Sequence, residues 1–201
     1  AIITDMSQPL LPSIGNALEI ADVMRAFDSG QGPMVEVAIE LGAQLLVQGH
    51  VFYTEKGARD GLVKCLSDGT AKNKFGMMVA AQGGPKNFTE RWEDYLNIAP
   101  AYEILAPSDG YVQAMDGTAL GRIVVALGGG RQREDDQIDH SVGLSEITPL
   151  GAKLRRGQLM VLVHCHDTEH ADNAMLSVQA AITVGATEPA PKPLILERII
   201  R

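Results

Sequence analysis

The sequence predicts a mixed fold, of the α/β class in its first part and of the α+β class in its second part. Three patterns carry this prediction. Ile2 to Thr4 form a β-branched stretch typical of a strand, residues 17–96 show repeated helical periodicity, and the residues beyond 100 alternate short strand patterns with turns. We place a domain boundary near Ala99, which divides the chain into residues 1–98 and 99–201.

The composition is that of an ordinary globular protein. The chain has 201 residues, a formal net charge of −8 and 45% hydrophobic residues, which argues against disorder. An acidic balance disfavours binding along a nucleic-acid backbone, so we expect no nucleic-acid partner. The longest apolar runs, such as Ile123–Leu127, fall far below the roughly 20 residues that span a bilayer, so we expect no membrane segment. Cys65 and Cys165 are too few for a disulfide framework, and we expect reduced thiols in the cytoplasm.

The chain opens directly in a strand pattern, Ala1-Ile2-Ile3-Thr4, which we expect to be buried. A buried strand of an α/β fold normally has neighbouring strands. We therefore expect the chain to be a fragment whose missing partner supplies part of the fold. A loop rich in Pro, Gly, Ser and Asn follows from Ser7, and Asn16 at its end is the expected helix N-cap.

Helical patterns fill the rest of the first part. A helix is predicted from Ala17, because apolar residues recur on one face until Ser29-Gly30. Pro33 opens a second helix, whose narrow polar stripe predicts that it is largely buried. The stripe consists of Glu36, Glu40, Gln44 and Gln48. The remaining predicted helices are Thr54–Leu66, Ala71–Gln82 and a short one around Asn87–Leu96 that contains Trp92.

The second part has strand and turn signals. Tyr102–Leu105 and Tyr111–Val112 flank Pro107-Ser108-Asp109-Gly110, which predicts a β-hairpin. Asp116 is the expected cap of a helix from Thr118 to Leu127. The other predicted elements are two strands within Gly151–Val163, a helix over Thr168–Val184 and a terminal strand over Leu194–Ile200.

Two groups of residues have the composition of ligand sites. His164, His166 and His170 with Asp167 suggest a metal site, but His170 falls in the next predicted element, so structural histidines are the favoured interpretation. Three glycines, Gly128–Gly130, precede Arg131 and Arg133 and suggest a phosphate cradle. Phosphate loops precede a helix, whereas these glycines follow one, so helix termination is favoured.

The sequence contains no complete set of catalytic residues. Glu134-Asp135-Asp136 has no surroundings that predict burial, so a solvated loop is favoured over paired catalytic acids. Ser141 lacks the G-x-S-x-G pattern of a hydrolase nucleophile. We therefore predict no catalytic residues and no organic cofactor in this chain.

Two segments, Ala106–Val112 and Leu150–Leu159, resemble the two halves of a biotinyl or lipoyl carrier domain. A carrier needs a lysine displayed at a tight turn, and these segments lack that feature. The resemblance favours a sandwich-like topology. It also leaves an alternative function, a non-catalytic scaffold or carrier-like module with a barrel-sandwich-related fold.

Longer motifs resemble the thymidine phosphorylase and pyrimidine-nucleoside phosphorylase family. In the first part these are Thr4–Leu10, Gly15–Glu19 and Met78–Gly84. In the second part Asp109–Val112, Ala119–Gly121, Val124–Arg131 and Ile138–Leu144 are similar, in order, to the carboxyl-terminal half of that family. The amino-terminal half of the family has no counterpart here. That half holds the Lys-His-Ser phosphate segment and the Arg, Ser and Lys that bind the pyrimidine.

The resemblance implies a fold and an activity. Residues 1–98 correspond to the carboxyl-terminal part of the family's α and α/β domains, and residues 99–201 to its α/β hammerhead domain. The family's pentosyltransferases use phosphate to cleave thymidine to thymine and 2-deoxyribose 1-phosphate. We expect the parent enzyme to be a cytoplasmic homodimer with these substrates, and the isolated chain to be inactive because the positioning residues are missing.

The resemblance also implies a potassium site. Matched residue by residue, its ligands here are the carbonyls of Leu10 and Ser13 and the carboxylate of Asp22, where Ser13 and Asp22 replace the family's commoner Ala and Glu. Carbonyl and carboxylate oxygens suit a hard cation. The alternative is that Asp22 is an ordinary surface residue of its helix. Asp5, at a strand end, is expected to border the cleft without being catalytic.

Overall fold

The computed structural model describes residues 1–199 and divides the chain into two units. The first unit comprises Ala1–Thr4, Ala21–Tyr95 and the end of the chain from Leu194, and the second comprises Asp5–Ile20 and Leu96–Pro193. The change of unit at Leu96 lies close to the boundary expected near Ala99. The two chain ends differ from the expectation, because each unit also takes in a segment from the opposite part of the sequence.

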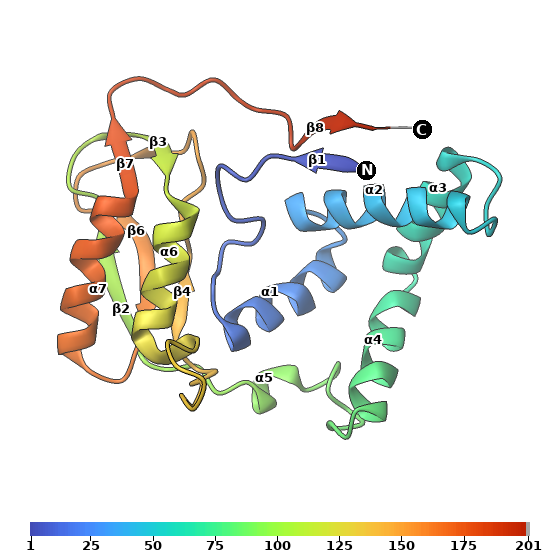
Figure 1. Cartoon of the computed structure of the whole chain (residues 1–201), viewed down its shortest axis with the longest axis horizontal. Helices are drawn as coiled ribbons and strands as arrows, with labels where there is room; N and C mark the ends of the chain where they lie inside the picture. The colour runs from blue at the N-terminus through green and yellow to red at the C-terminus, as the bar shows by residue number, and fades with distance from the viewer. Residues whose placement is uncertain (200–201) are drawn as a thin grey trace. The chain divides into compact units, whose positions relative to one another are not determined.

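The first unit consists of helices and one two-stranded ribbon (Figure 1). Its helices are α1 (Asn16–Ser29), which starts in the second unit, α2 (Pro33–Gln48), α3 (Glu55–Ser67), α4 (Thr70–Ala81) and α5 (Trp92–Tyr95). As predicted, Pro33 opens α2. Thr54 caps α3, where its side chain accepts a hydrogen bond from the Gly57 amide at 3.1 Å.

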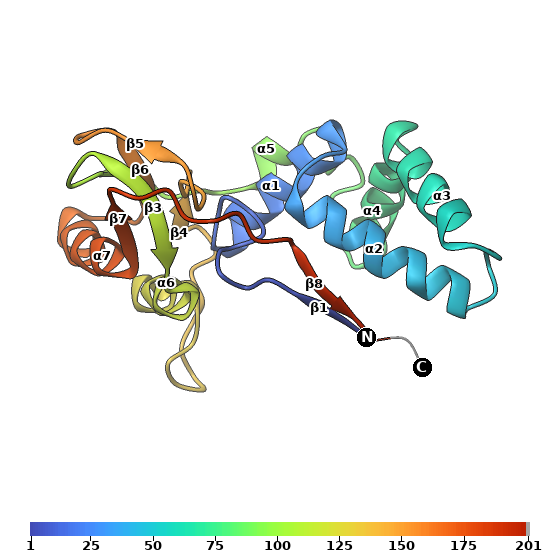
Figure 2. The ribbon, with the colours of Figure 1, turned by 90° about the horizontal axis from the view of Figure 1, so that it is seen from above.

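The ribbon joins the two ends of the chain. Strand β1 (Ile2–Thr4) pairs antiparallel with β8 (Ile195–Arg198), and Figure 2 shows the two strands side by side. The expectation that β1 is buried is wrong for this chain, since Ile3 is 42% exposed and β8 is the one strand that pairs with β1 among residues 1–199. The predicted terminal strand ends at Arg198, and Ile200 lies outside the described residues.

The polar stripe of α2 is correctly placed, but the interpretation as a largely buried helix is wrong. Leu41 and Leu45 are exposed, whereas Glu40, a member of the polar stripe, is 1% exposed. Glu40 is buried because Arg59 of α3 and Arg198 of β8 both pair with its carboxylate. The stripe therefore contains the most buried acid of the unit.

The second unit is built from two three-stranded antiparallel sheets and two helices. One sheet has the order β2-β6-β4 and the other β5-β3-β7. The strands are β2 (Ala101–Leu105), β3 (Gly110–Met115), β4 (Gly143–Ser145), β5 (Lys153–Leu154), β6 (Leu159–His164) and β7 (Ile182–Gly185). Helices α6 (Gly117–Val124), which continues into the π-helical turn η1 (Val125–Gly129), and α7 (Thr168–Ala181) pack side by side in Figure 1.

One hydrophobic core holds this second unit together. Its largest fully buried members are Ile104, Val112, Leu120, Leu144, Leu154, Met160, Val161, Val163 and Val178. These residues come from both sheets and both helices, which explains why short strands suffice here. The mixed α/β and α+β class is thus confirmed at the level of helices with small antiparallel sheets. Within residues 1–199 no helix has the length and apolar character needed to cross a membrane.

The predicted hairpin between residues 102 and 112 is wrong. β2 pairs with β6, while β3 pairs with β5 and β7 in the other sheet. The turn signal at residues 107–110 is real, but the chain uses it to cross from one sheet to the other. Gly110 has φ +158°, and a Cβ there would approach the Gly185 carbonyl oxygen to 2.6 Å, so the glycine permits a close approach of two backbones.

The helix predicted over residues 168–184 is too long. α7 ends at Ala181, and the β-branched Ile182-Thr183-Val184 begins β7 at once. Pairing with β3 overrides the helical pattern there.

The expected N-cap of α6 is confirmed. The Asp116 carboxylate accepts a hydrogen bond from the Ala119 amide at 2.9 Å at the start of this helix.

Candidate functional site

The loop that follows β1 is held firmly to the second unit. The side-chain oxygen of Gln8 accepts a hydrogen bond from the Leu150 amide at 2.9 Å. Ile14 exchanges backbone hydrogen bonds of 2.9 and 2.8 Å with Leu144 of β4. The course of the loop between these anchors is therefore fixed by backbone contacts, which is what a site built from carbonyl groups requires.

Leu10 and Ser13 leave their carbonyls free within this loop. The neighbouring Pro12 carbonyl accepts from the Ile147 amide at 3.0 Å, whereas no donor among residues 1–199 bonds the carbonyl of Leu10 or of Ser13. Ser13 is buried, at 5% exposure. Buried carbonyls normally have partners, so the Ser13 oxygen in particular is available for a ligand.

The start of α1 differs from the expected N-cap. The helix begins at Asn16, whose side-chain amide donates to the Gly129 carbonyl at 3.2 Å. The preceding Gly15 has φ +144°, and its amide donates to the Glu19 carboxylate at 3.1 Å. A Cβ at Gly15 would lie 2.7 Å from the Val142 carbonyl oxygen, so only glycine lets the loop approach this segment so closely.

Asp22 is a buried acid on α1 and not an ordinary surface residue. It is 6% exposed, and its Oδ1 accepts a 2.8 Å hydrogen bond from Arg25. Its Oδ2 is buried and has no hydrogen-bond partner among the described residues. The Arg25 guanidinium also lies over the Trp92 ring, 5.7 Å from its centroid. An unpartnered buried carboxylate oxygen is costly, and a bound cation would relieve that cost.

The three residues matched to the potassium site thus have the right donor chemistry. Leu10 and Ser13 belong to one loop of the second unit, and Asp22 belongs to the first unit. Two free carbonyls and one orphaned carboxylate oxygen are hard oxygen donors of the kind that bind alkali and alkaline-earth cations.

The three histidines of the suggested metal site, His164, His166 and His170, each have their own partners. His164 is buried, with Nε2 2.7 Å from Ser145 Oγ and Nδ1 3.0 Å from the Ala99 carbonyl oxygen. The ring of His170 lies 2.8 Å from Asp167, whose carboxylate also caps α7. Within residues 1–199 no group of three or more His, Cys, Asp or Glu side chains is arranged to hold a metal.

His166 takes part in a network that the sequence did not reveal. Its Nε2 lies 2.7 Å from Asp139 Oδ2 and 3.3 Å from Ser141 Oγ. The Ser141 hydroxyl donates to Asp139 Oδ1 at 2.6 Å and is the main cause that holds the pKa of Asp139 below its ordinary value. A hydrolytic relay needs serine and acid on different ring nitrogens. Here both meet Nε2, so the group is not such a relay.

The glycines after α6 end the helix and do not cradle an anion. Gly128 has φ +97°, the left-handed conformation typical of a helix C-terminus. Arg131 and Arg133 are exposed, and the amides of Gln132 and Arg133 donate to the Asp136 carboxylate at 3.0 and 2.8 Å. These two amides are therefore bonded to a carboxylate of the loop itself.

One comparison with known protein families concerns part of the second unit. Residues 111–185 match the pyrimidine nucleoside phosphorylase C-terminal domain. The matched range runs from β3 to the end of β7 and includes both helices of this unit. This part of the second unit is thus similar to a domain of nucleoside phosphorylases.

The whole chain is similar to thymidine phosphorylases. It is 37% identical to thymidine phosphorylase of Sinorhizobium fredii over 99% of the chain, and 38% identical to that of Sinorhizobium medicae over 100% of the chain. The enzyme of Colwellia psychrerythraea is 37% identical over 97% of the chain. The chain spans 45–46% of the length of these relatives. Over at least 97% of its length the chain is therefore similar to a carboxyl-terminal portion of thymidine phosphorylases.

Proposed function

We propose that this chain is the carboxyl-terminal portion of an enzyme that uses phosphate to cleave thymidine to thymine and 2-deoxyribose 1-phosphate. The observation that carries the proposal is the similarity to thymidine phosphorylases, which extends over at least 97% of the chain at 37–38% identity. In this reaction a phosphate oxygen forms a bond to C1′ of the sugar while the bond from C1′ to thymine N1 breaks. The departing base takes up a proton.

The second unit fits the role of a covering domain in this enzyme. Its core, its two sheets and the capped helices α6 and α7 form one stably packed body, which we assign to the family's hammerhead domain. The proposal includes a homodimeric parent enzyme, as the resemblance implies. Positioned groups that stabilise the leaving base belong to the family's amino-terminal half, so the chain alone is proposed to lack turnover.

The proposal also assigns Leu10, Ser13 and Asp22 to a potassium site. Two features support it, namely the free carbonyls of the loop and the buried, unpartnered Oδ2 of Asp22. In such a site Leu10 and Ser13 would each offer a backbone carbonyl oxygen and Asp22 a carboxylate oxygen to the ion.

An activity assay of two proteins tests the proposed function. The isolated chain is expected to show no phosphorolysis of thymidine. A chimera in which the amino-terminal portion of the Sinorhizobium medicae enzyme precedes Ala1 is expected to release thymine in a phosphate-dependent manner. Turnover by the isolated chain would contradict the proposed dependence on the missing half.

Asp22→Asn tests the cation assignment within that chimera. The substitution keeps the shape of the side chain and removes its charge, so the potassium concentration for half-maximal activity is expected to rise roughly tenfold, because a charge-assisted contact is lost. Asp28→Asn on the same helix is the control, since Asp28 is exposed and bonded to Lys72. Equal potassium dependence of the Asp22→Asn variant and the unmodified chimera would withdraw the assignment.

A further inference from the structure

The loop from Gly128 to Ser141 supports the first turn of α1. The side-chain amide of Asn16 donates to the Gly129 carbonyl at 3.2 Å, and the Ala17 amide donates to the His140 carbonyl at 3.1 Å. The first amides of a helix have no partner within the helix. The loop therefore supplies an acceptor that the first turn of α1 needs.

Asp139 fastens this loop from within. Its amide donates to the Gly128 carbonyl at 2.9 Å, which closes the loop at its base. Its Oδ1 accepts from both the amide and the hydroxyl of Ser141, at 2.9 and 2.6 Å. The remaining oxygen, Oδ2, has one partner among residues 1–199, the His166 ring at 2.7 Å.

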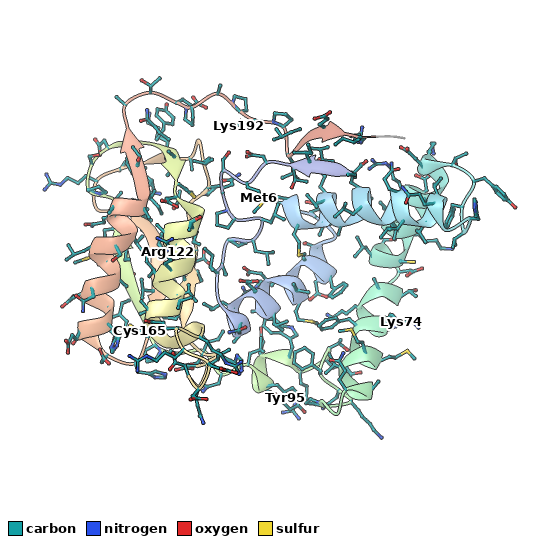
Figure 3. All side chains as sticks on the ribbon, in the orientation of Figure 1. Met6, Lys74, Tyr95, Arg122, Cys165 and Lys192 are labelled. Atoms are coloured by element: carbon teal, nitrogen blue, oxygen red, sulfur yellow. The ribbon has the colours of Figure 1, made fainter. Side chains whose placement is uncertain are left out.

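His166 comes from a different element, the turn between β6 and α7. Figure 3 labels its neighbour Cys165 at this turn. Because the ionised Asp139 carboxylate can only accept hydrogen bonds, His166 Nε2 must be the donor toward Oδ2. A protonated imidazole makes this a charge-assisted hydrogen bond, roughly twice as strong as one from the neutral ring.

The charges around the ring favour such a pair. From the loop, His166 faces the carboxylate of Asp139, and His140 is the adjacent titratable group there. From its own turn, the Asp167 carboxylate is bonded to His170, and burial raises the pKa of the Cys165 thiol, so the thiol is neutral. The Ser141 hydroxyl, and after it the Ser141 amide and His166, hold the pKa of Asp139 below its ordinary value. Asp139 therefore stays ionised wherever histidine titrates.

We propose that His166 is a pH-sensitive latch, which fastens the Gly128–Ser141 loop to the turn between β6 and α7 when its ring is protonated. The ring is 60% exposed, so protons reach it freely. Histidine changes charge between about pH 5 and 8. As the pH rises through that range the latch weakens, and the support that the loop gives to Asn16 and Ala17 weakens with it.

Hydrogen exchange of the full chain tests the latch. Backbone protection factors, corrected for the intrinsic effect of pH, are compared at about pH 5.5 and about pH 8. Amides of residues 128–141 and of Ala17 are expected to be roughly twofold to fivefold better protected at the lower pH, the range of an exposed ion pair. The His166 ring resonances, followed by NMR in the same samples, report the protonation state of the ring at each pH.

Two variants and one control separate the latch from other pH effects. His166→Gln keeps an amide donor without a charge, and Asp139→Asn removes the carboxylate charge, so both are expected to abolish the pH difference. His170→Gln is the control, because His170 pairs with Asp167 at the start of its own helix. The latch is overturned if His166→Gln retains the pH difference, or if protection is equal at both pH values while the ring titrates.

Discussion

Replacing both Arg59 and Arg198 by methionine is expected to lower the free energy of unfolding of the first unit by about 3 to 5 kcal/mol. The two arginines pair with opposite oxygens of Glu40, Arg198 at 2.8 Å from Oε1 and Arg59 with Oε2. The Glu40 side chain is only 2% exposed. Without the arginines its charge would remain buried and uncompensated, which costs far more than the loss of an exposed ion pair.

Removal of the charge should reverse most of this loss. Glu40→Leu added to the double variant leaves apolar side chains of similar volume, an arrangement that is often as stable as a buried ion pair. Lys56→Ala is the control, because Lys56 pairs with Asp60 on an exposed surface and its loss should change stability far less. Urea unfolding followed by the fluorescence of Trp92, the single tryptophan of the chain, measures all variants. A triple variant less stable than the double one would contradict the account.

Gly143→Ala is expected to destabilise the second unit by about 3 kcal/mol. Gly143 has φ +155°, and a Cβ there would overlap the Ile14 carbonyl oxygen and approach Leu18 Cδ1 to 2.9 Å. The substitution would therefore separate β4 from the loop that carries Leu10 and Ser13. Backbone strain and steric overlap act together at this position.

Gly157→Ala separates strain from overlap. Gly157 has φ +80° but open space around its Cβ position, so the change should cost about 1 kcal/mol from strain alone. Amide exchange of the β6 core residues under mild denaturant measures both variants. Equal losses at the two glycines would show that the contact between β4 and Ile14 contributes nothing to stability.

Local signals in the sequence sufficed to place the starts of several helices. The caps at Thr54 and Asp116 and the opening proline of α2 act within one turn, so their effects are visible in neighbouring residues. The partner of a strand is not local. The turn before Gly110 predicts a hairpin, yet β2 and β3 belong to different sheets, because their partners come from strands much further along the chain, β6 for β2 and β5 and β7 for β3.

For the candidate site too, the sequence does not predict features that depend on residues far apart in the chain. The resemblance supplied Leu10, Ser13 and Asp22, and periodicity placed Asp22 on a helix, but only the structure shows that its Oδ2 is buried without a partner. Glu40 belongs to the polar stripe of α2, and its burial depends on two arginines from other elements. Asp139 and His166 lie in a charged loop and at a strand end, and no spacing rule connects them.

The central claim is that this chain completes a thymidine phosphorylase. The most direct measurement is phosphate-dependent release of thymine from thymidine by the chimera that joins the amino-terminal portion of the Sinorhizobium medicae enzyme to Ala1. That amino-terminal portion alone and this chain alone serve as controls. The account predicts turnover by the chimera and none by either part. A folded chimera that binds thymidine and phosphate but does not release thymine would contradict it.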